Sequence, residues 1–236
     1  MRVSFFFPAY NDEATIEPLA RLLDQVLAAE CDQHEILIID DAGPDRSGEV
    51  ADRVAAEMAC VKVIHHTHNL GYGRVLLTGL RHSRFEWIGF TDGDMQYDVR
   101  ELPRLIEQAR AGADAVVGYK TERADGFGRR LTSGLYNGAI RLLLGLGLRD
   151  ADCAFKLMHR RIFDGFTPSV DYREAFLLVE AFYKARLAGA RIVEVPVSHR
   201  ARPHGVSNCF TWRTARRMAW YTTRAAVFGR LLGAFR

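Results

Sequence analysis

Short apolar runs alternate with amphipathic helical patterns along the first half of this 236-residue chain. Apolar residues recur at steps of three and four between the runs, which predicts helices there. Strands that alternate with helices form a mostly parallel sheet covered by helices on both faces. We therefore expect an α/β fold built on a single sheet. The predicted strands cover residues 3–7, 35–39, 61–64, 87–90 and 115–117, and the predicted helices cover 13–29, 45–58, 72–83 and 101–110.

The second half of the chain has a less regular pattern. Residues 191–197 alternate as in a strand, where Pro196 requires an edge or bulge position because proline cannot donate to the ladder. Further helices are predicted over 130–146, 173–187 and 210–232, and a polar hinge at 150–156 leads into a short strand.

Polar turns, three of them with glycine, follow four of the predicted strands. The turns cover residues 8–13, 40–47, 69–73 and 92–94. Helix capping by Asp45 or Ser47 and tight turning at glycines explain each turn by itself. In parallel sheets, however, ligands bind where the carboxyl ends of the strands meet. Four such turns therefore predict a ligand-binding edge.

The most distinctive turn is the Asp-x-Asp sequence of Asp92, Gly93 and Asp94. Two residues apart at the end of a strand, the carboxylates project to the same side of the chain. Oxygen ligands of this kind suit a hard divalent cation that is shared with substrate phosphates. Gln96 adds a neutral oxygen nearby. An acidic turn in contact with solvent remains the alternative for the motif alone.

Charge is distributed unevenly along the chain. No acidic residue follows Glu194, and subtracting the eight arginines beyond it from the net charge of +3 leaves −5 for residues 1–194. We therefore divide the chain into a domain at 1–208 and a basic C-terminal helix at 209–236, for which an anionic partner is expected. The eight arginines are Arg200, Arg202, Arg213, Arg216, Arg217, Arg224, Arg230 and Arg236.

The C-terminal helix has the composition of an interfacial membrane helix. Arg213, Arg216, Arg217 and Arg224 fall on one helical face, and Trp212, Trp220 and Tyr221 are aromatics suited to the headgroup region. The sequence thus predicts binding to an anionic membrane surface. A helix that packs on the domain with its arginines in water is the equal alternative.

Cysteine and histidine positions bear on metal binding and on compartment. Cys31, Cys60, Cys153 and Cys209 are scattered without a Cys-x-x-Cys pair, which favours free thiols in a reducing compartment. The His65–His68 cluster lacks the spacing of a zinc site, so we expect a strand end and loop there. The sequence shows neither a signal peptide nor a membrane span, which predicts a cytoplasmic protein.

Together these motifs resemble glycosyltransferase family 2, which has the GT-A fold, and by pattern the dolichyl- or polyprenyl-phosphate sugar synthases. The resemblance covers about residues 3–208. Two departures are Asn208, where the synthases usually carry Lys, and Asp12, where Glu is common. The residues that carry the resemblance are Pro8, Tyr10, Asn11, Asp40, Asp41, Pro44, Asp45, Asn69, Gly71, Gly73, Asp92, Asp94, Gln96, Asp150, Asp152, Cys153, Phe155, Lys156, Arg202, Gly205 and Ser207.

The resemblance implies a role for each matched position. Asp92, Asp94 and Gln96 would hold a Mg²⁺ or Mn²⁺ ion. The nucleotide would be bound by Pro8, Tyr10, Asp12, Asp40, Asp41, Gly71, Asp92 and Gly93. Besides Asp94, the expected catalytic residues are Lys120, Arg129, Ser133 and Arg202. At the position of Lys120 the synthases usually carry an arginine. Arg129 and Ser133 would face the acceptor phosphate, and Arg202 would reach the donor diphosphate.

The reaction implied by the resemblance is an inverting transfer of a hexose from a GDP- or UDP-sugar to a polyprenyl phosphate at the cytoplasmic face of the membrane. A lipid phosphate is already anionic at neutral pH, whereas a hydroxyl acceptor needs a base. No Glu-Asp pair precedes the late helix, and Glu174 and Glu180 are expected to face solvent or pair with basic residues. This favours the phosphate, and a saccharide hydroxyl acceptor in cell-surface polysaccharide synthesis is the alternative.

Two other classes of function fit the sequence less well. A dinucleotide-dependent oxidoreductase would need a third glycine after Gly71 and Gly73, and its glycine motif would follow the first strand instead of the third. A nucleic-acid-binding module would explain the basic tail but none of the strand-end motifs. We therefore expect no nucleic-acid partner.

Overall fold

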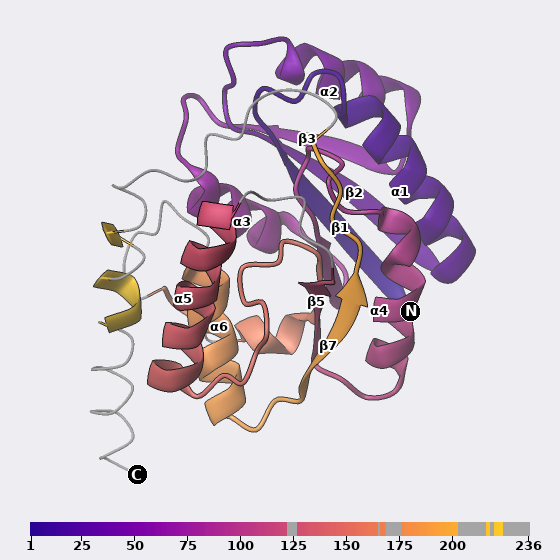
Figure 1. The fold of residues 1–236 in the computed structure, drawn as a ribbon. Helices are drawn as coiled ribbons and strands as arrows, with labels where there is room; N and C mark the ends of the chain where they lie inside the picture. Colours follow the sequence, from indigo (N-terminus) through magenta and orange to yellow (C-terminus); the bar gives the residue numbers. More distant parts are fainter. Residues whose placement is uncertain (122–126, 165, 169–175, 203–215, 218–219, 224–236) are drawn as a thin grey trace.

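A computed structural model describes the chain except residues 122–126, 165, 169–175, 203–215, 218–219 and 224–236. The described strands form one seven-stranded sheet in the order β3-β2-β1-β4-β6-β5-β7 (Figure 1). The strands are β1 (Arg2–Ala9), β2 (Gln33–Asp40), β3 (Val61–His65), β4 (Trp87–Phe90), β5 (Ala115–Lys120), β6 (Lys156–His159) and β7 (Ile192–Val197).

Helices cover both faces of this sheet. Helix α1 packs against α2 and α4, and α3 packs against α6. Figure 1 shows α1, α2 and α4 on one side of the sheet and α3, α5 and α6 on the other. The helices are α1 (Ile16–Glu30), α2 (Ser47–Glu57), α3 (Tyr72–His82), α4 (Leu102–Arg110), α5 (Phe127–Leu144) and α6 (Phe176–Leu187), with 3₁₀ turns η1 (Val99–Glu101) and η2 (Arg160–Phe163).

The strand directions confirm the prediction of a mostly parallel sheet. Six strands run the same way, and β6 runs antiparallel between β4 and β5. The short strand expected after the polar hinge at 150–156 is β6, but the sequence pattern did not predict its antiparallel direction. Pro196 lies in β7, which forms an edge of the sheet, so the expected edge position is confirmed. Among the described helices, none has the length and apolar character needed to cross a bilayer.

Some element boundaries differ from the sequence prediction. Helix α1 begins at Ile16 instead of residue 13 because residues 12–15 form a turn in which the N–H groups of Thr15 and Ile16 bond to the Asp12 carbonyl. Helix α4 begins after the turn η1, whose first residues are capped by Asp98 through a bond from the Arg100 N–H. The predicted boundary between residues 208 and 209 lies outside the described residues.

The centre of the core is β1, which lies between β2 and β4. Its residues from Val3 to Ala9 are buried. Two glycines make room for its phenylalanines. A Cβ atom on Gly89 would lie 2.1 Å from the ring of Phe5, and one on Gly79 would lie 2.3 Å from the ring of Phe6. The packing of β1 against its neighbours therefore depends on the absence of side chains at these two positions.

Gly89→Ala should destabilise the fold, because the added methyl group overlaps the Phe5 ring inside a closely packed core. Overpacking of this kind costs about 1–3 kcal/mol. The measurement is the free energy of unfolding in urea.

The matched control is Gly134→Ala in α5. Gly134 is exposed, and a Cβ atom there would meet nothing within 4 Å among the described residues. Alanine at a helical position is favoured over glycine by about 0.5–1 kcal/mol, so this variant should be stabilised. Equal stabilities of the two variants would contradict the packing described for β1.

Candidate active site

The predicted ligand-binding edge is formed by the ends of adjacent parallel strands. Strands β2, β1 and β4 lie next to one another, with Ala9 paired to Asp40 and Phe6 paired to Phe90. Strands β5 and β7 end at the same edge, and the antiparallel β6 begins there at Lys156. The turns that carry the sequence motifs are therefore brought together by the sheet itself.

Gly93 brings the Asp-x-Asp turn into contact with the end of β1. A Cβ atom on Gly93 would lie 2.2 Å from the carbonyl oxygen of Pro8 and 3.2 Å from Oδ2 of Asp12. The Thr15 hydroxyl donates to the Gly93 carbonyl at 2.7 Å. No side chain fits between these segments, so only glycine allows Asp92 and Asp94 to sit this close to Asp12.

Asp92 is a half-buried carboxylate that accepts a hydrogen bond from the Tyr72 hydroxyl at the start of α3. Burial raises the pKa of Asp92 to about 7, and the charge of Asp94 adds to this shift. The Tyr72 hydroxyl and Lys120 oppose it, while Asp152 raises the pKa further. The local field at Asp92 is therefore negative and favours an added positive charge.

Asp94 is buried and already has a cationic partner. Its Oδ1 accepts from the Gln96 N–H at 3.0 Å, and its Oδ2 pairs with a guanidinium nitrogen of Arg202 at 2.8 Å. With Asp92, it offers only carboxylate oxygens, which are the ligands that Mg²⁺ and Mn²⁺ prefer. The residues present thus fit the divalent cation expected from the sequence.

Arg202 reaches Asp94 because the chain after β7 pairs with the chain after β4. The Arg200 N–H donates to the Gln96 carbonyl at 2.8 Å, and Tyr97 and His199 form an isolated antiparallel bridge. The side-chain nitrogen of Gln96 donates to the Arg200 carbonyl at 3.0 Å. Gln96 therefore holds the Arg202 segment in place here, and its role as a metal ligand stays a prediction.

The two aspartates that follow β2 have different surroundings. Asp41 accepts from the N–H groups of Leu70 and Gly71 at 2.9 and 3.0 Å and contacts Nδ1 of His66 at 2.7 Å, so it organises the loop into α3. Oδ2 of Asp40 contacts Nδ1 of His65 at 2.8 Å. Its Oδ1 is buried and has no hydrogen-bond partner among the described residues. Asp40 thus keeps an acceptor available at this edge.

The end of β1 completes the edge with Pro8, Tyr10 and Asp12. Tyr10 is exposed, and its N–H lies 3.4 Å from Oδ2 of Asp12. Burial raises the pKa of Asp12 to about 6, whereas the Tyr10 N–H and the charge of Arg202 lower it. Asp94 raises it further. Asp12, Asp92 and Asp94 therefore form one cluster of interacting carboxylates.

Lys120, the last residue of β5, lies close enough to this cluster to lower the pKa of Asp92. Its Nζ is 3.7 Å from Oδ2 of the buried Asp150. Two hydrogen bonds hold the loop that contains Asp150. Oδ1 of Asn137 in α5 accepts from the Ala151 N–H at 3.0 Å. The buried Lys156 donates to the Cys153 carbonyl. The two carboxylates of this loop differ in exposure to solvent, since Asp150 is buried and Asp152 is exposed.

Not every predicted site residue can be placed. Arg129 and Ser133 belong to α5, but their side chains lie outside the described part of the structure, as does Glu174. Glu180 is buried and pairs with Lys184 at 2.7 Å, which confirms the expected basic partner. The expectation of a strand end and loop at the histidines is also confirmed, since His65 is the last residue of β3 and His66 follows it, and they contact Asp40 and Asp41.

Sequence reasoning missed the contact between Tyr72 and Asp92. Tyr72 lies between Gly71 and Gly73 at the start of α3. The two glycines were included in the predicted binding motif, and the tyrosine was given no role. It also assigned no role to Asp152, whose charge acts on Asp92. The available signal was the position of Asp152 in a polar hinge between two predicted elements.

Known proteins resemble this chain in both sequence and fold. Residues 4–166 match the sequence profile of the family described as Glycosyl transferase family 2. Glycosyltransferase AglD from Haloferax volcanii is 33% identical over 204 residues, which cover 84% of this chain and 33% of that protein. The undecaprenyl-phosphate 4-deoxy-4-formamido-L-arabinose transferase from Edwardsiella ictaluri is 32% identical over 211 residues, or 87% of this chain and 62% of that protein.

Among solved structures, glucosyl-3-phosphoglycerate synthase from Mycobacterium tuberculosis in complex with phosphoglyceric acid superposes with a TM-score of 0.71 at 20% identity, covering 95% of this chain and 80% of that chain. Its complex with Mn²⁺, UDP and phosphoglyceric acid gives a TM-score of 0.69 at 18% identity, covering 95% and 78%. These likenesses show the GT-A fold. With the profile match and the relatives above, they show that this chain belongs to glycosyl transferase family 2.

Proposed function

We propose that this chain transfers a hexose from a nucleotide-sugar to a polyprenyl phosphate, with inversion at the sugar carbon and with a divalent cation. The observation that carries the proposal is the pair of buried or half-buried carboxylates, Asp92 and Asp94, held beside Arg202 at the edge where the parallel strands end. The chain spans only 33% and 62% of the two relatives described above. The activities of those relatives therefore support the proposal but are not assigned to this chain.

Asp92 and Asp94 would hold the cation, with Gln96 as a third oxygen ligand. When bound, Mg²⁺ or Mn²⁺ neutralises the developing charge of the diphosphate leaving group as a Lewis acid. Arg202 pairs with Asp94 through one guanidinium nitrogen. Other N–H groups of the same guanidinium would donate to the phosphates. Lys120 adds a positive charge that acts on Asp92.

The donor is proposed to be a GDP- or UDP-sugar, and the solved complex of the mycobacterial synthase with Mn²⁺ and UDP supports a nucleotide of this class. Pro8, Tyr10 and Asp12 would line its base and ribose. The buried Oδ1 of Asp40 would accept from a nucleotide N–H or hydroxyl, since no described residue donates to it. Asp41 would act by positioning Gly71, whose N–H it binds.

A polyprenyl phosphate acceptor fits the arrangement around α5. Positions 129, 133 and 137 are spaced four residues apart and therefore share one helical face. Asn137 on that face accepts from the Ala151 N–H in the loop that carries Asp152, which supports the proposal that this face lies toward the candidate active site. The curated name of the Edwardsiella ictaluri relative specifies an undecaprenyl-phosphate, which supports the same acceptor class.

The second candidate acceptor is a saccharide hydroxyl, and one observation favours it. Asp152 is an exposed carboxylate whose charge is felt at Asp92, so it is placed to act as a base toward a hydroxyl. A phosphate acceptor needs no base. Asp152→Asn should therefore leave transfer to a phosphate acceptor largely intact and abolish transfer to a hydroxyl.

The C-terminal segment is proposed to hold the protein at the cytoplasmic face of an anionic membrane. In its described part, Tyr221 and Thr222 are buried, and the Tyr221 ring lies 5.7 Å from that of Phe176 in α6. Arg216, Arg217 and Trp220 are exposed. This supports a helix that packs on the domain through Tyr221 while presenting basic and aromatic side chains outward.

Asp94→Ala should lower turnover by more than the roughly 10–100-fold that loss of an outer-shell partner costs, because it removes a direct metal ligand. The fold should persist, as judged by circular dichroism and thermal unfolding. Nucleoside diphosphate release is the assay, and the exposed Asp32→Ala is the control. Chelation by EDTA should abolish activity reversibly, and wild-type turnover of Asp94→Ala in chelator would contradict the proposed metal site.

Arg129→Ala and Ser133→Ala should weaken use of the lipid phosphate. A hydrogen bond to a charged group contributes about 1.5–3 kcal/mol, so the KM for polyprenyl phosphate should rise on the order of 10–100-fold. Donor affinity from titration calorimetry should not change. Arg186→Ala, an exposed arginine on α6, is the control. Loss of donor affinity with unchanged acceptor kinetics would assign these residues to the donor instead.

The double variant Arg216→Gln, Arg217→Gln should weaken binding to anionic liposomes. Each arginine near such a surface contributes about 1 kcal/mol, so two substitutions should lower partitioning roughly 30-fold at low salt. High salt should release the wild type, and neutral liposomes should bind it weakly. The control is Arg53→Gln, Arg104→Gln, exposed positions on α2 and α4. Unchanged sedimentation of the tail variant would leave only the packing role of this helix.

Truncation after Asn208 should abolish the same liposome binding. It also removes Tyr221 from its contact with Phe176, so thermal unfolding must first show that the truncated protein is folded.

A further inference from the structure

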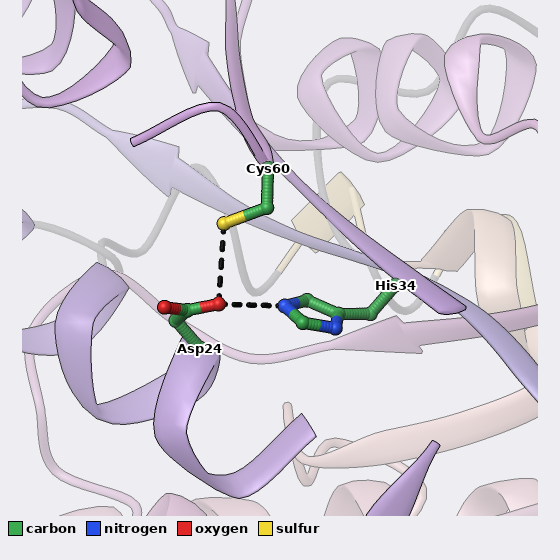
Figure 2. Close-up of side chains that lie close together, drawn as sticks. All are labelled: Asp24, His34 and Cys60. Carbon is green, nitrogen blue, oxygen red and sulfur yellow. Dashed lines mark hydrogen bonds and ion pairs between the residues drawn. The ribbon is translucent and has the colours of Figure 1, made fainter. Parts of the chain in front are cut away.

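Three side chains with metal-binding chemistry meet at the end of the sheet opposite the candidate active site. Asp24 comes from α1, His34 is the second residue of β2, and Cys60 directly precedes β3. Figure 2 shows the imidazole of His34 and the thiol of Cys60 both directed at the carboxylate of Asp24. Nε2 of His34 lies 2.6 Å from Oδ1 of Asp24, and the Cys60 thiol donates to the same oxygen at 3.2 Å.

This combination of nitrogen, sulfur and oxygen donors is the set that Zn²⁺ selects among biological cations. One ligand atom from each residue lies within 4.8 Å of the other two. Ligand atoms around tetrahedral zinc are separated by roughly 3.3–3.8 Å, as follows from bond lengths of about 2.0–2.3 Å. Small rotations of these side chains therefore bring all three onto one ion.

The surroundings of the three residues also suit a bound cation. The side chains of His34 and Asp24 are 14% and 38% exposed, so an ion would be held by the protein on one side and by water on the other. Burial and the neighbouring Asp24 raise the pKa of the Cys60 thiol to about 11. A metal ion binds the thiolate, so an ion at this position would displace the thiol proton to solvent, and its affinity should rise with pH.

We propose that Asp24, His34 and Cys60 form a Zn²⁺ site that joins α1 to the beginnings of β2 and β3, with water as the fourth ligand. The site is separate from the candidate active site. His34 and Asp40 are six residues apart along β2, which corresponds to roughly 20 Å. Its role is therefore structural, since an ion there cross-links three segments of the fold.

Co²⁺ tests the site directly, because only a cobalt–thiolate bond gives an intense charge-transfer absorption in the near ultraviolet. Protein freed of metal by a chelator is titrated with Co²⁺ in excess Mg²⁺, which occupies the oxygen ligands of Asp92 and Asp94 but does not compete for thiolate and imidazole. We expect one equivalent of Co²⁺ to give this absorption and one equivalent of Zn²⁺ to remove it.

Cys60→Ala and His34→Ala should abolish the absorption or weaken Co²⁺ binding by about 100-fold or more, whereas Cys31→Ala and His68→Ala should preserve it. Cys31 is the matched thiol, half-buried like Cys60 but outside the cluster. No charge-transfer absorption in the wild type, or its persistence in Cys60→Ala, would overturn the proposal and leave a hydrogen-bonded cluster only.

Thermal unfolding provides a second readout that does not depend on spectroscopy. A ligand that binds only the folded state raises its stability, so Zn²⁺ at 100 times its Kd should raise the unfolding temperature by roughly 5–10 °C. The shift should be lost in His34→Ala and retained in His68→Ala. An equal shift in both variants would show that zinc acts elsewhere.

Discussion

The buried negative charge at the end of β4 is the constraint around which the candidate active site is organised. Asp94 is buried and Asp92 half-buried, and their mutual repulsion must be offset by positive charge from other segments. Arg202 arrives from beyond β7 and Lys120 from the end of β5. In the proposed function, a divalent cation held by Asp92 and Asp94 would supply the same kind of compensation beside the donor diphosphate. The charge balance within the protein and the proposed chemistry therefore depend on the same two carboxylates.

Close backbone approach is what allows these charges to meet. Gly93 lets the Asp-x-Asp turn contact the Pro8 carbonyl, and Gly89 lets β4 pack against Phe5 of β1. Backbone pairing between Gln96 and Arg200 then carries Arg202 to the same place. The site thus depends on glycines and on main-chain hydrogen bonds as much as on the charged side chains. Substitutions at these positions are expected to act on activity by moving the carboxylates.

Much of this arrangement could be predicted from the sequence, because parallel strands place their carboxyl ends at one edge. The edge position of Pro196 could also be predicted, because proline has no N–H to donate to a neighbouring strand. The short strand β6 was expected after the polar hinge, but its antiparallel direction could not be predicted, since its four residues carry no directional signal. Contacts between residues far apart in the sequence could not be predicted either. Examples are Tyr72 with Asp92 and the cluster of Asp24, His34 and Cys60, whose members have no regular spacing.

The central claim is that this edge binds a nucleotide-sugar and delivers its sugar to a polyprenyl phosphate. The most direct measurement is a screen of GDP- and UDP-sugars for nucleoside diphosphate release, with and without polyprenyl phosphate, in Mg²⁺ or Mn²⁺. The account predicts release from one donor class that depends on the lipid phosphate and yields a glycosylated lipid. Release that is unaffected by the lipid phosphate but stimulated by a saccharide would contradict the proposed acceptor. No release from any donor would contradict the proposed activity itself.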